Sequence, residues 1–568
     1  MKFLLVALNA KYIHTNLAVR SLAAYVGEEL SSYVEIAEYT INMQKEEVVA
    51  DIVRRKPDAV GFSCYIWNMV MIEAIVADLH LILDDLPIWL GGPEVSYDTQ
   101  ERLRRLPYLA GIIAGEGEAA FLEILQKLVH SEPREKQSLV LQSSNPIDLT
   151  QVPFWFLQKA NENPMQPGKD QIIYYESSRG CPFGCAYCLS GRDQMLRFRD
   201  LEVVKAELDV FLRSKVAQVK FVDRTFNADR RRAREMIRYL QAHDNGVTNF
   251  HFEIAGDLLE DEDLVLFGTL RPGFVQLEIG IQSTNVDTLK AISRSVDQEE
   301  LWNKIEVIRA AGNVHQHLDL IVGLPYEDYA SLKRSFDRVY MARPQQFQLG
   351  FLKVLKGSML ATRTKEWGIV YSSQPPYEVI STTWISYEEI QKLKQVENAL
   401  NNYYNSGQYT CTLPILEGLY ETPFALYEAL GEFHRTIPGV RESSSRISRY
   451  EKLFDFVCRY FPTYQKIVRE KLTFDFYLRE NAKTRPKFAP DREQWAESIR
   501  QFYRQEALQK KVLTTYGDCD SSQLRRLTHI EVFSDRAWLF DYQMRNPFTN
   551  NAQAIDISDY FQFSKKRT

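Results

Sequence analysis

The first 130 residues alternate short apolar runs with segments of helical period. The apolar runs are KFLLVALN, YVEIAEYT, AVGFSCYIW, IWLGG and GIIAGEG, and the amphipathic segment LAVRSLAAYVGEEL follows the first of them. Short apolar runs that alternate with helical segments are typical of a parallel sheet covered by helices. We therefore predict a doubly wound, Rossmann-like α/β domain over residues 1–135.

The loops that follow these predicted strands are candidates for ligand binding. In open parallel sheets, ligands bind beyond the carboxyl ends of the strands, where loops lead into helices. The glycines of GGPE and GEGE let a flat or phosphate-bearing ligand approach the backbone, although each run also suits an ordinary tight turn. The candidate residues in these loops are Ser63, Gly91, Gly92, Glu94, Gly115 and Gly117.

A second pattern of alternating strands and helices begins near residue 171. Residues 136–168, which precede it, carry four prolines and polar clusters with little periodicity, as a linker would. The predicted strands are IIYYESS, VKFVDRTF, FHFEIAGD, FVQLEIGIQS, HLDLIVGLP and FQLGFLKVL. Six such units predict a partial (β/α)6 barrel over residues 169–365, with its active site at the carboxyl ends of the strands.

Residues 366–568 have a different character. Segments such as EEIQKLKQVENALNNYYNS and RISRYEKLFDFVCRYFP have helical period and many tyrosines and phenylalanines, so this domain should be mainly helical. The runs HIEVFSD and AWLFDYQM alternate β-forming residues and predict a small hairpin or sheet near the end. Aromatic stripes on helices form cores more often than binding sites, so we assign this domain no chemistry.

Composition and charge restrict the class of protein. The chain has 568 residues and a net charge of −6, so nothing indicates a general nucleic-acid surface. The first apolar stretch ends at Asn9, too early for a signal peptide, and no run of about 18 apolar residues predicts a membrane span. Four of the seven cysteines are scattered, which favours a reducing cytoplasm over a disulfide framework. The composition fits a cytoplasmic protein of several domains.

The other three cysteines, Cys181, Cys185 and Cys188, are clustered in SSRGCPFGCAYCLSG. Structural zinc and iron-sulfur sites are normally closed by four protein ligands, whereas three leave one coordination position for a substrate or cofactor. The alternative is a zinc ion completed by a distant residue such as His251, but zinc pairs usually come as C-x2-C with a second such pair. The motif therefore indicates a metal site that performs chemistry.

The cysteine motif, together with residues 171–360, resembles the radical S-adenosylmethionine (SAM) enzymes. In that family three thiolates hold a 4Fe-4S cluster, the open iron binds the methionine part of SAM, and electron transfer cleaves SAM to a 5'-deoxyadenosyl radical. The resemblance implies that Tyr187 lies beside adenine, although simple packing would also explain an aromatic residue there. By the same resemblance, LEIGIQSTNVDTLKAISR places Gln282 on the ribose and Arg294 on the methionine carboxylate, and HLDLIVGLP places Asp319 on the ribose hydroxyls.

One segment departs from the family pattern. Many members carry Gly-Gly-Glu at the second strand to meet the amino group of SAM, whereas this chain has VDRTFN, in which Asp223 and Thr225 are the candidate replacements. Glu253 and Glu278 lie inside otherwise apolar strands. A buried carboxylate is costly unless it is paired, so at least one of these two should contact SAM or another ligand.

The order of the domains resembles the cobalamin-binding (B12) subgroup of radical SAM proteins, and the last domain resembles the uncharacterised DUF4080-like domain of one bacterial group. The usual cobalamin fingerprint, Asp-x-His-x-x-Gly, is missing, because the corresponding loop reads NAKYIHTN. The cobalt would then lack a lower protein ligand unless His14 supplies one. A domain that has lost its cofactor is the alternative.

The resemblance implies an enzyme that reductively cleaves SAM at a 4Fe-4S cluster and transfers a methyl group from methylcobalamin to an unactivated carbon. Such an enzyme needs a reductant such as flavodoxin or ferredoxin. The alternatives are radical SAM chemistry without methylation, or a redox sensor or scaffold that binds cobalamin or the cluster. No residue identifies the substrate, which leaves peptide, lipid, small metabolite and RNA open.

Overall fold

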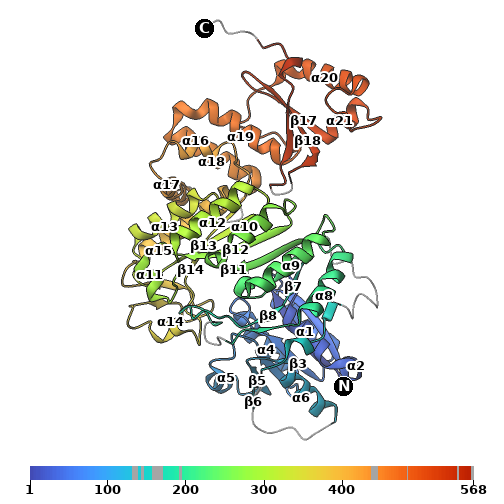
Figure 1. Cartoon of the computed structure of the whole chain (residues 1–568), viewed down its shortest axis with the longest axis vertical. Coiled ribbons are helices and arrows are strands. Elements are labelled where there is room, and N and C mark those ends of the chain that lie inside the picture. The colour runs from blue at the N-terminus through green and yellow to red at the C-terminus, as the bar shows by residue number, and fades with distance from the viewer. Residues whose placement is uncertain are drawn as a thin grey trace. The chain divides into compact units, whose positions relative to one another are not determined.

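The computed structural model of the chain forms two compact units (Figure 1). The first contains residues 1–332 and 349–387, and the second contains residues 333–348 and 388–568. The structure describes residues 1–130, 139–142, 146–156, 171–190, 195–436, 445–482, 484–546 and 549–563.

The N-terminal part of the first unit is a six-stranded parallel sheet with strand order β2-β1-β3-β4-β5-β6. Its strands are β1 (Phe3–Asn9), β2 (Val34–Thr40), β3 (Ala59–Ser63), β4 (Ile88–Gly91), β5 (Gly111–Ala114) and β6 (Leu139–Gln142). Its helices are α1 (Leu17–Tyr25), α2 (Gly27–Ser31), α3 (Lys45–Arg55), α4 (Met69–Ile82), α5 (Thr99–Arg105) and α6 (Glu118–Val129). The strand order runs outward in both directions from β1 and β3, which confirms the predicted doubly wound fold.

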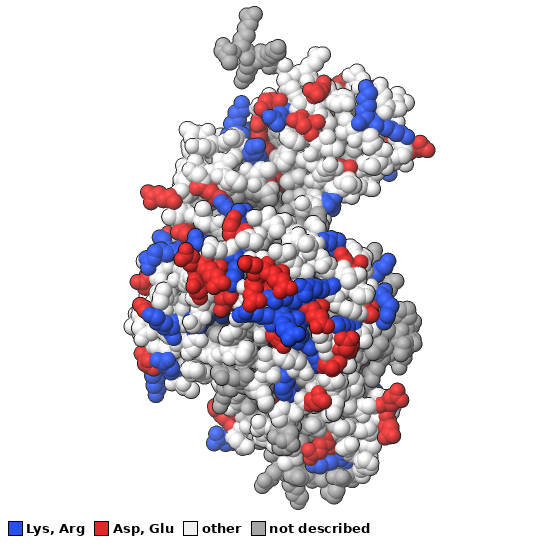
Figure 2. All heavy atoms as spheres, in the orientation of Figure 1, with Lys and Arg blue, Asp and Glu red and all other residues white. Residues whose placement is uncertain are grey.

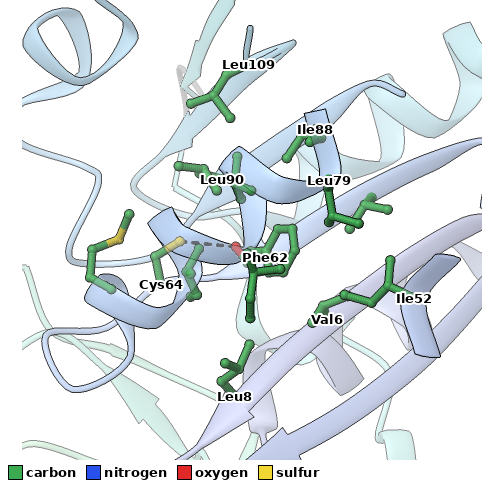
Figure 3. Close-up of a cluster of buried hydrophobic side chains, with 14 of the residues drawn as sticks. Val6, Leu8, Ile52, Phe62, Cys64, Leu79, Ile88, Leu90 and Leu109 are labelled. Carbon is green, nitrogen blue, oxygen red and sulfur yellow. Dashed lines mark hydrogen bonds between the residues drawn. The ribbon is translucent and has the colours of Figure 1, made fainter. Parts of the chain in front are cut away.

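Both faces of this sheet are covered by apolar side chains. Val6 and Leu8 of β1 pack with Phe62 of β3 and with Ile52 of α3 in one buried cluster (Figure 3). The alternate residues of β1 belong to a second cluster that includes Phe121 of α6. Because successive side chains of a strand point to opposite faces, a strand covered on both sides is apolar at every position, as the run FLLVAL is.

The segment predicted as a linker, 136–168, lies partly outside the described residues. Within it, β6 pairs in parallel with β5 at the edge of the sheet. The guanidinium of Arg20 lies over the Trp155 ring, 4.7 Å from its centroid, and the Phe154 and Phe211 rings are 5.1 Å apart. The described parts of this segment are therefore packed against both the N-terminal domain and the barrel.

The second six-stranded sheet is the predicted partial barrel, with strand order β14-β13-β12-β11-β10-β7. It belongs to the first unit except for residues 333–348, which are part of the second unit. Its strands are β7 (Ile172–Tyr175), β10 (Gln218–Phe221), β11 (Asn249–Ile254), β12 (Val275–Gln282), β13 (His315–Val322) and β14 (Gln346–Phe351). The helices between and after them are α8 (Leu201–Arg213), α9 (Arg230–Ala242), α10 (Asp261–Gly268), α11 (Val286–Ala291), α12 (Gln298–Ala311) and α13 (Tyr329–Met341). A short antiparallel pair, β8 (Ser178–Arg179) and β9 (Arg197–Phe198), follows β7.

The alternate positions of the barrel strands have opposite characters. On β11, Phe250 and Phe252 are fully buried, whereas the positions that alternate with them are polar and include His251 and Glu253. The neighbouring β12 repeats the pattern in VQLEIGIQ and β13 in HQHLDLIV. Alternation with a period of two places His251, Glu253, Glu278, His317 and Asp319 on one face of the sheet, whereas Gln316 lies on the other face and donates to the carbonyl of Ile305 in α12. The barrel therefore has a polar interior.

The outer surface of the barrel is strongly charged around α9 (Figure 2). Arginines of α9 pair with carboxylates at the start of α10, as in Arg234 with Asp263 at 2.6 Å and Arg238 with Glu262. Figure 2 shows basic and acidic side chains side by side there. This face is thus neutralised by its own ion pairs.

The second unit is mainly helical and ends in a small sheet, as predicted. Its helices are α15 (Tyr387–Tyr403), α16 (Leu413–Glu417), α17 (Pro423–Thr436), α18 (Arg446–Tyr460), α19 (Gln465–Arg479), α20 (Ala496–Gln509) and α21 (Ser521–Leu527). The strands β17 (Thr528–Val532), β18 (Ala537–Arg545) and β19 (Ala552–Asp556) form an antiparallel sheet in that order. Aromatic side chains such as Tyr450 and Phe476, whose ring centroids are 5.2 Å apart, lie in the core of this unit. Among the described residues, no helix is long and apolar enough to cross a membrane.

Candidate active site

A cavity of about 280 Å³ lies at the carboxyl ends of the barrel strands, and all three clustered cysteines line it. Cys181, Cys185 and Cys188 are free thiols; the first is buried and the other two are half-buried. Burial raises the pKa of Cys185, while the charge of Arg294 acts in the opposite direction. The structure therefore brings three potential thiolate ligands to one concave site.

Backbone contacts shape the loop that carries the cysteines. The N–H of Cys188 donates to the carbonyl of Cys185 (3.1 Å), and the N–H of Ala186 donates to Ile292 (3.0 Å). Gly180 has φ +96°, and a Cβ there would lie 2.2 Å from the carbonyl oxygen of Met195. Only glycine combines this backbone conformation with so close an approach, so the loop requires it.

Four residues that the family resemblance assigns to SAM, namely Tyr187, Gln282, Arg294 and Asp319, line the same cavity. Arg294 donates from Nη2 to the carbonyl of Gly280 at 2.5 Å, and Asp319 Oδ1 lies 3.0 Å from His317 Nε2. Within the described part of the chain, Gln282 Oε1 and Arg294 Nε are buried without a hydrogen-bond partner.

These two unpartnered atoms are informative because an unsatisfied buried polar atom costs about 1–3 kcal/mol. Native structures pair nearly all such atoms, with protein, water or ligand. Gln282 also has φ +68°, a backbone conformation that few non-glycine residues adopt. Three thiols and two unpaired polar groups facing one cavity fit a metal cluster with a polar organic ligand.

The two glutamates that sequence reasoning singled out also line this cavity, and they are register partners on β11 and β12. Burial and the charge of Glu278 raise the pKa of Glu253 to about 7. Burial would likewise raise the pKa of Glu278, but a hydrogen bond from His251 and the charge of Lys220 lower it to about 2. Near neutral pH the site thus combines a carboxylate with a carboxyl group that holds its proton part of the time.

Sequence reasoning missed the polar cluster around Glu278. The Oε2 atom of Glu278 lies 3.1 Å from both Lys220 Nζ and His251 Nε2, and 4.0 Å from His317 Nδ1. The two histidines and Glu278 could hold a metal ion by distance, since their ligand atoms lie within 4.8 Å of one another, but the Lys220 ammonium already supplies a cation. His251, considered above as a zinc ligand, thus bonds to a carboxylate. The signal in the sequence was the alternation of polar residues along FHFE, LEIG and HLD.

Asp223 is not among the residues that line the cavity. Its carboxylate accepts hydrogen bonds from the Ser177 N–H (2.8 Å), the Ser177 hydroxyl (2.5 Å) and the Ser178 hydroxyl (2.8 Å). The next two residues, Arg224 and Thr225, do line it, and Thr225 Oγ1 lies 3.5 Å from Cys181 Sγ. The strand end predicted to bind SAM therefore reaches the cavity through Arg224 and Thr225, while Asp223 holds the loop that leads to the cysteines.

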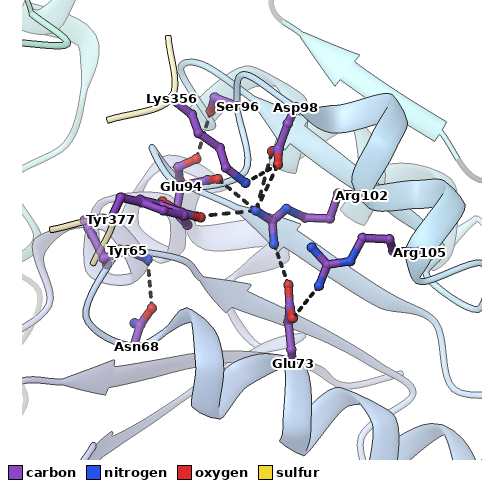
Figure 4. Close-up of polar contacts among 11 residues, drawn as sticks. Tyr65, Asn68, Glu73, Glu94, Ser96, Asp98, Arg102, Arg105, Lys356 and Tyr377 are labelled. Atoms are coloured by element: carbon purple, nitrogen blue, oxygen red, sulfur yellow. Dashed lines mark hydrogen bonds and ion pairs between the residues drawn. The ribbon is translucent and has the colours of Figure 1, made fainter. Parts of the chain in front are cut away.

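In the N-terminal domain, Glu94 belongs to a closed polar network at the strand ends (Figure 4). Glu94 is buried and accepts hydrogen bonds from Arg102 (3.4 Å) and from the hydroxyl of Tyr377. Arg102, 1% exposed, also contacts Glu73 at 2.6 Å and Asp98 at 3.3 Å. Lys356 Nζ, from the segment after the barrel, lies 2.5 Å from Asp98. This network joins the N-terminal domain to the barrel within the first unit.

The other loop residues of this domain have mixed surroundings. Ser63 Oγ accepts a hydrogen bond from Asn16 at 3.4 Å. Gly92 has φ +116°, and a Cβ there would lie 2.6 Å from the carbonyl oxygen of Cys64, so local packing requires glycine. Gly115, also at positive φ, faces open space, whereas Cβ atoms at Gly91 and Gly117 would make tolerable contacts. Their predicted contact with cobalamin stays a prediction.

His14 lies where the N-terminal domain meets the barrel. Its Nδ1 is 2.8 Å from the hydroxyl of Tyr174 on β7. Burial lowers the pKa of His14, and the charges of Lys11 and Lys220 lower it further. A neutral imidazole therefore bridges the two parts of the first unit.

Three family matches follow one another along the chain. Residues 4–125 match the B12 binding domain, residues 175–339 match the radical SAM superfamily, and residues 365–551 match a family described as a protein of unknown function (DUF4080).

Two methyltransferases are similar over about half of this chain. One is the 2-(S-pantetheinyl)-carbapenam-3-carboxylate methyltransferase of Streptantibioticus cattleyicolor, 26% identical over 51% of this chain and 45% of its own length. The other is the cobalamin-dependent radical SAM methyltransferase TokK of Streptomyces tokunonensis, 25% identical over 49% of this chain and 44% of its own length. The chain thus spans less than half the length of these two relatives.

Solved structures show the same fold at low identity. The cobalamin-dependent SAM radical enzyme OxsB with aqua-cobalamin bound has a TM-score of 0.53 and 14% identity over 84% of this chain and 80% of that one. The methyltransferase TsrM of Kitasatospora setae, with cobalamin and a [4Fe-4S] cluster bound, has a TM-score of 0.50 and 12% identity over 66% of this chain and 82% of that one.

The family matches agree with the chemistry of the cavity. The cofactors of the matched domains are a 4Fe-4S cluster with SAM for the barrel and cobalamin for the N-terminal domain, as the cysteine motif and the domain order predicted. The DUF4080 match covers most of the helical second unit. The chain therefore has a B12 binding domain, a radical SAM domain and a DUF4080 domain, in that order.

Proposed function

We propose that this protein is a radical SAM enzyme that transfers a methyl group to an unactivated carbon, with cobalamin as the methyl carrier. The observation that carries the proposal is the cavity in which three free thiols face the unpartnered Gln282 Oε1 and Arg294 Nε. The names of two similar proteins, both methyltransferases, support methyl transfer over other radical reactions.

In this proposal Cys181, Cys185 and Cys188 hold the cluster as thiolates and leave one iron position open. When bound, the cluster and SAM supply a carbon-based radical and cobalamin supplies the methyl group. Arg294 offers a planar pair of donors to the methionine carboxylate, a geometry that a guanidinium fulfils well.

The remaining lining residues position the nucleoside part of SAM. Asp319 and Gln282 would bind the ribose hydroxyls, and Tyr187, in the turn of the cysteine loop, would lie along the adenine ring. Tyr187 is half-buried, and desolvation raises the pKa of its hydroxyl well above the usual range, so the hydroxyl stays neutral. Glu253, half-protonated near pH 7, would offer a hydrogen-bond donor to the bound ligand.

The proposal includes the cellular setting. A radical SAM enzyme needs a one-electron reductant, which we take to be a flavodoxin or ferredoxin. All seven cysteines are free, which supports a reducing compartment such as the cytoplasm.

The test is anaerobic reconstitution with iron, sulfide and hydroxocobalamin. The dithionite-reduced protein should convert SAM to 5'-deoxyadenosine, and replacement of Cys181, Cys185 and Cys188 by alanine should abolish both the brown colour and this conversion. Cys458→Ala is the matched control, because this half-buried free cysteine does not line the cavity. Turnover that persists in the triple variant would refute the cluster assignment.

The same preparation separates the alternatives. Protein that retains cobalamin after gel filtration supports methyl transfer, and protein that retains none contradicts the cobalamin branch while leaving the cluster branch intact. A redox sensor or scaffold would keep its cofactors but would not consume SAM.

A further inference from the structure

The second unit contains a cavity of its own, with a volume of about 490 Å³. Its walls come from the beginning of α20, the end of α21, the start of β17 and the segment before α20. Four arginines line it, together with two carboxylates, Asp491 and Glu493. The four arginines are Arg485, Arg492, Arg500 and Arg525. The lining therefore carries a net positive charge.

Two of these arginines have a structural role. Arg485 Nη2 and Arg492 Nη1 contact the carboxylate of Glu531 at 2.9 Å and 3.1 Å, and His529 Nε2 lies 2.7 Å from the same carboxylate. Glu531 is completely buried. A buried carboxylate must be paired, so this cluster holds the wall of the cavity together. One carboxylate balances only one of the two guanidinium charges.

The other two arginines are hardly used by the fold. The guanidinium of Arg525 lies 5.3 Å from the centroid of the Tyr503 ring, and among the described residues it has no ion pair. Within the described part of the chain, the one ion pair of Arg500, on α20, is with Glu497 one turn away, at 2.7 Å, and its side chain is 52% exposed. An exposed pair of this kind contributes little to stability. Both guanidinium groups are therefore available to a ligand.

The ordinary explanation for exposed arginines is a solvated helix surface. Arg504 of α20 and Arg526 of α21 are arginines of this ordinary kind, because they are exposed and do not line the cavity. Arg500 and Arg525 differ from them in converging on one concave site from two helices, beside the Tyr503 ring. A guanidinium over the face of an aromatic ring keeps its N–H donors, which lie in the guanidinium plane, free for an oxyanion.

We propose that this cavity binds a small molecule with an oxyanion group, a phosphate monoester or a carboxylate, through Arg492, Arg500 and Arg525. Guanidinium groups bind both oxyanions through pairs of charge-assisted hydrogen bonds. The volume is within the range of cavities that hold small organic ligands. This site gives the DUF4080 domain a binding role that is independent of the chemistry proposed for the barrel.

The test is calorimetric titration of the full-length reconstituted protein with three probes that share one aryl ring: phenyl phosphate, benzoate and phenol. Ionic strength is held constant with sodium chloride. We expect saturable binding of phenyl phosphate, benzoate or both, and none of phenol. Binding of phenyl phosphate alone assigns the site to phosphates, binding of benzoate alone assigns it to carboxylates, and binding of both leaves the general oxyanion assignment.

Matched variants show whether binding occurs at this cavity. Arg525→Gln and Arg500→Gln should each weaken the affinity about tenfold, the value of one charge-assisted hydrogen bond. Arg526→Gln and Arg504→Gln, on the same helices, should leave it unchanged. Thermal unfolding followed by circular dichroism verifies that each variant folds. If Arg525→Gln does not fold, Arg500→Gln provides the test.

Two outcomes would overturn the proposal. The first is that neither oxyanion binds the folded wild-type protein at millimolar concentration. The second is that Arg526→Gln weakens binding as much as Arg525→Gln, which would indicate diffuse attraction to a basic surface. Neither outcome depends on SAM cleavage, so this test and that of the barrel fail separately.

Discussion

The two six-stranded parallel sheets use polar residues at their strand ends in opposite ways. In the N-terminal domain, Glu94 and Arg102 bond to each other, Arg102 also pairs with Glu73, and Glu94 accepts a hydrogen bond from Tyr377 in the segment after the barrel. In the barrel, Gln282 and Arg294 keep buried polar atoms without a partner in the described protein. The same position in a parallel sheet can therefore serve either the fold or a ligand. The two arginines differ in what they bind, since Arg102 forms ion pairs with three carboxylates whereas Arg294 donates to the carbonyl of Gly280.

The largest expected effect tests the structural side of this comparison. Arg102→Ala leaves Glu73, Glu94 and Asp98 near one another without their shared cation, and it should lower the free energy of unfolding by about 3–5 kcal/mol. Urea denaturation of the protein measures this change.

Arg105→Ala is the matched control, because Arg105 pairs with the same Glu73 but is half exposed. It should cost at most about 1 kcal/mol. Equal losses in the two variants would show that the buried network does not hold the strand ends.

A smaller effect is expected from Glu253, on the ligand side of the comparison. Its folded pKa of about 7 lies above the ordinary value of 4.5. Between these two values the folded protein binds more protons than the unfolded chain, so stability falls as pH rises through this window. Glu253→Gln removes that loss. At pH 8 the variant should be more stable than the wild type by about 2–3 kcal/mol, and at pH 4 the two should be nearly equal.

Urea denaturation at both pH values, on protein without its cluster, measures the difference. Glu278→Gln is the counterpart with the opposite sign. Its pKa is lowered to about 2 by His251 and Lys220, so ionised Glu278 stabilises the fold at neutral pH and its loss should destabilise the protein there. If Glu253→Gln and Glu278→Gln changed the free energy of unfolding in the same direction at pH 8, the opposite pKa shifts given to these two glutamates would be contradicted.

Much of the barrel site could be predicted because its signals are local. Three cysteines fall within eight residues, and Gln282 and Arg294 are separated by a turn and the short helix α11. The cluster of Lys220, His251 and His317 was missed because its members come from three different strands, and only the pairing of these strands in the sheet brings them to one carboxylate.

The partners of polar residues at the strand ends could not be predicted. The sequence shows a polar residue at a strand end but does not show its partner. Glu94 meets Tyr377, 283 residues later, and Asp223 meets Ser177, 46 residues earlier. Strand β6 was hidden for a related reason, since LVLQ is a short edge strand in an otherwise polar, proline-containing segment. Long-range pairing decides these positions, and one sequence does not reveal it.

The most direct test of the central claim is the electron paramagnetic resonance spectrum of the reduced cluster, recorded with and without SAM in the wild type and in Arg294→Gln. We expect SAM to change the wild-type spectrum, and the variant to need about tenfold more SAM for the same change, because it loses a charge-assisted pair of hydrogen bonds. The variant should unfold at the same urea concentration as the wild type. A wild-type spectrum that SAM leaves unchanged would contradict the claim that this cavity places SAM on the cluster.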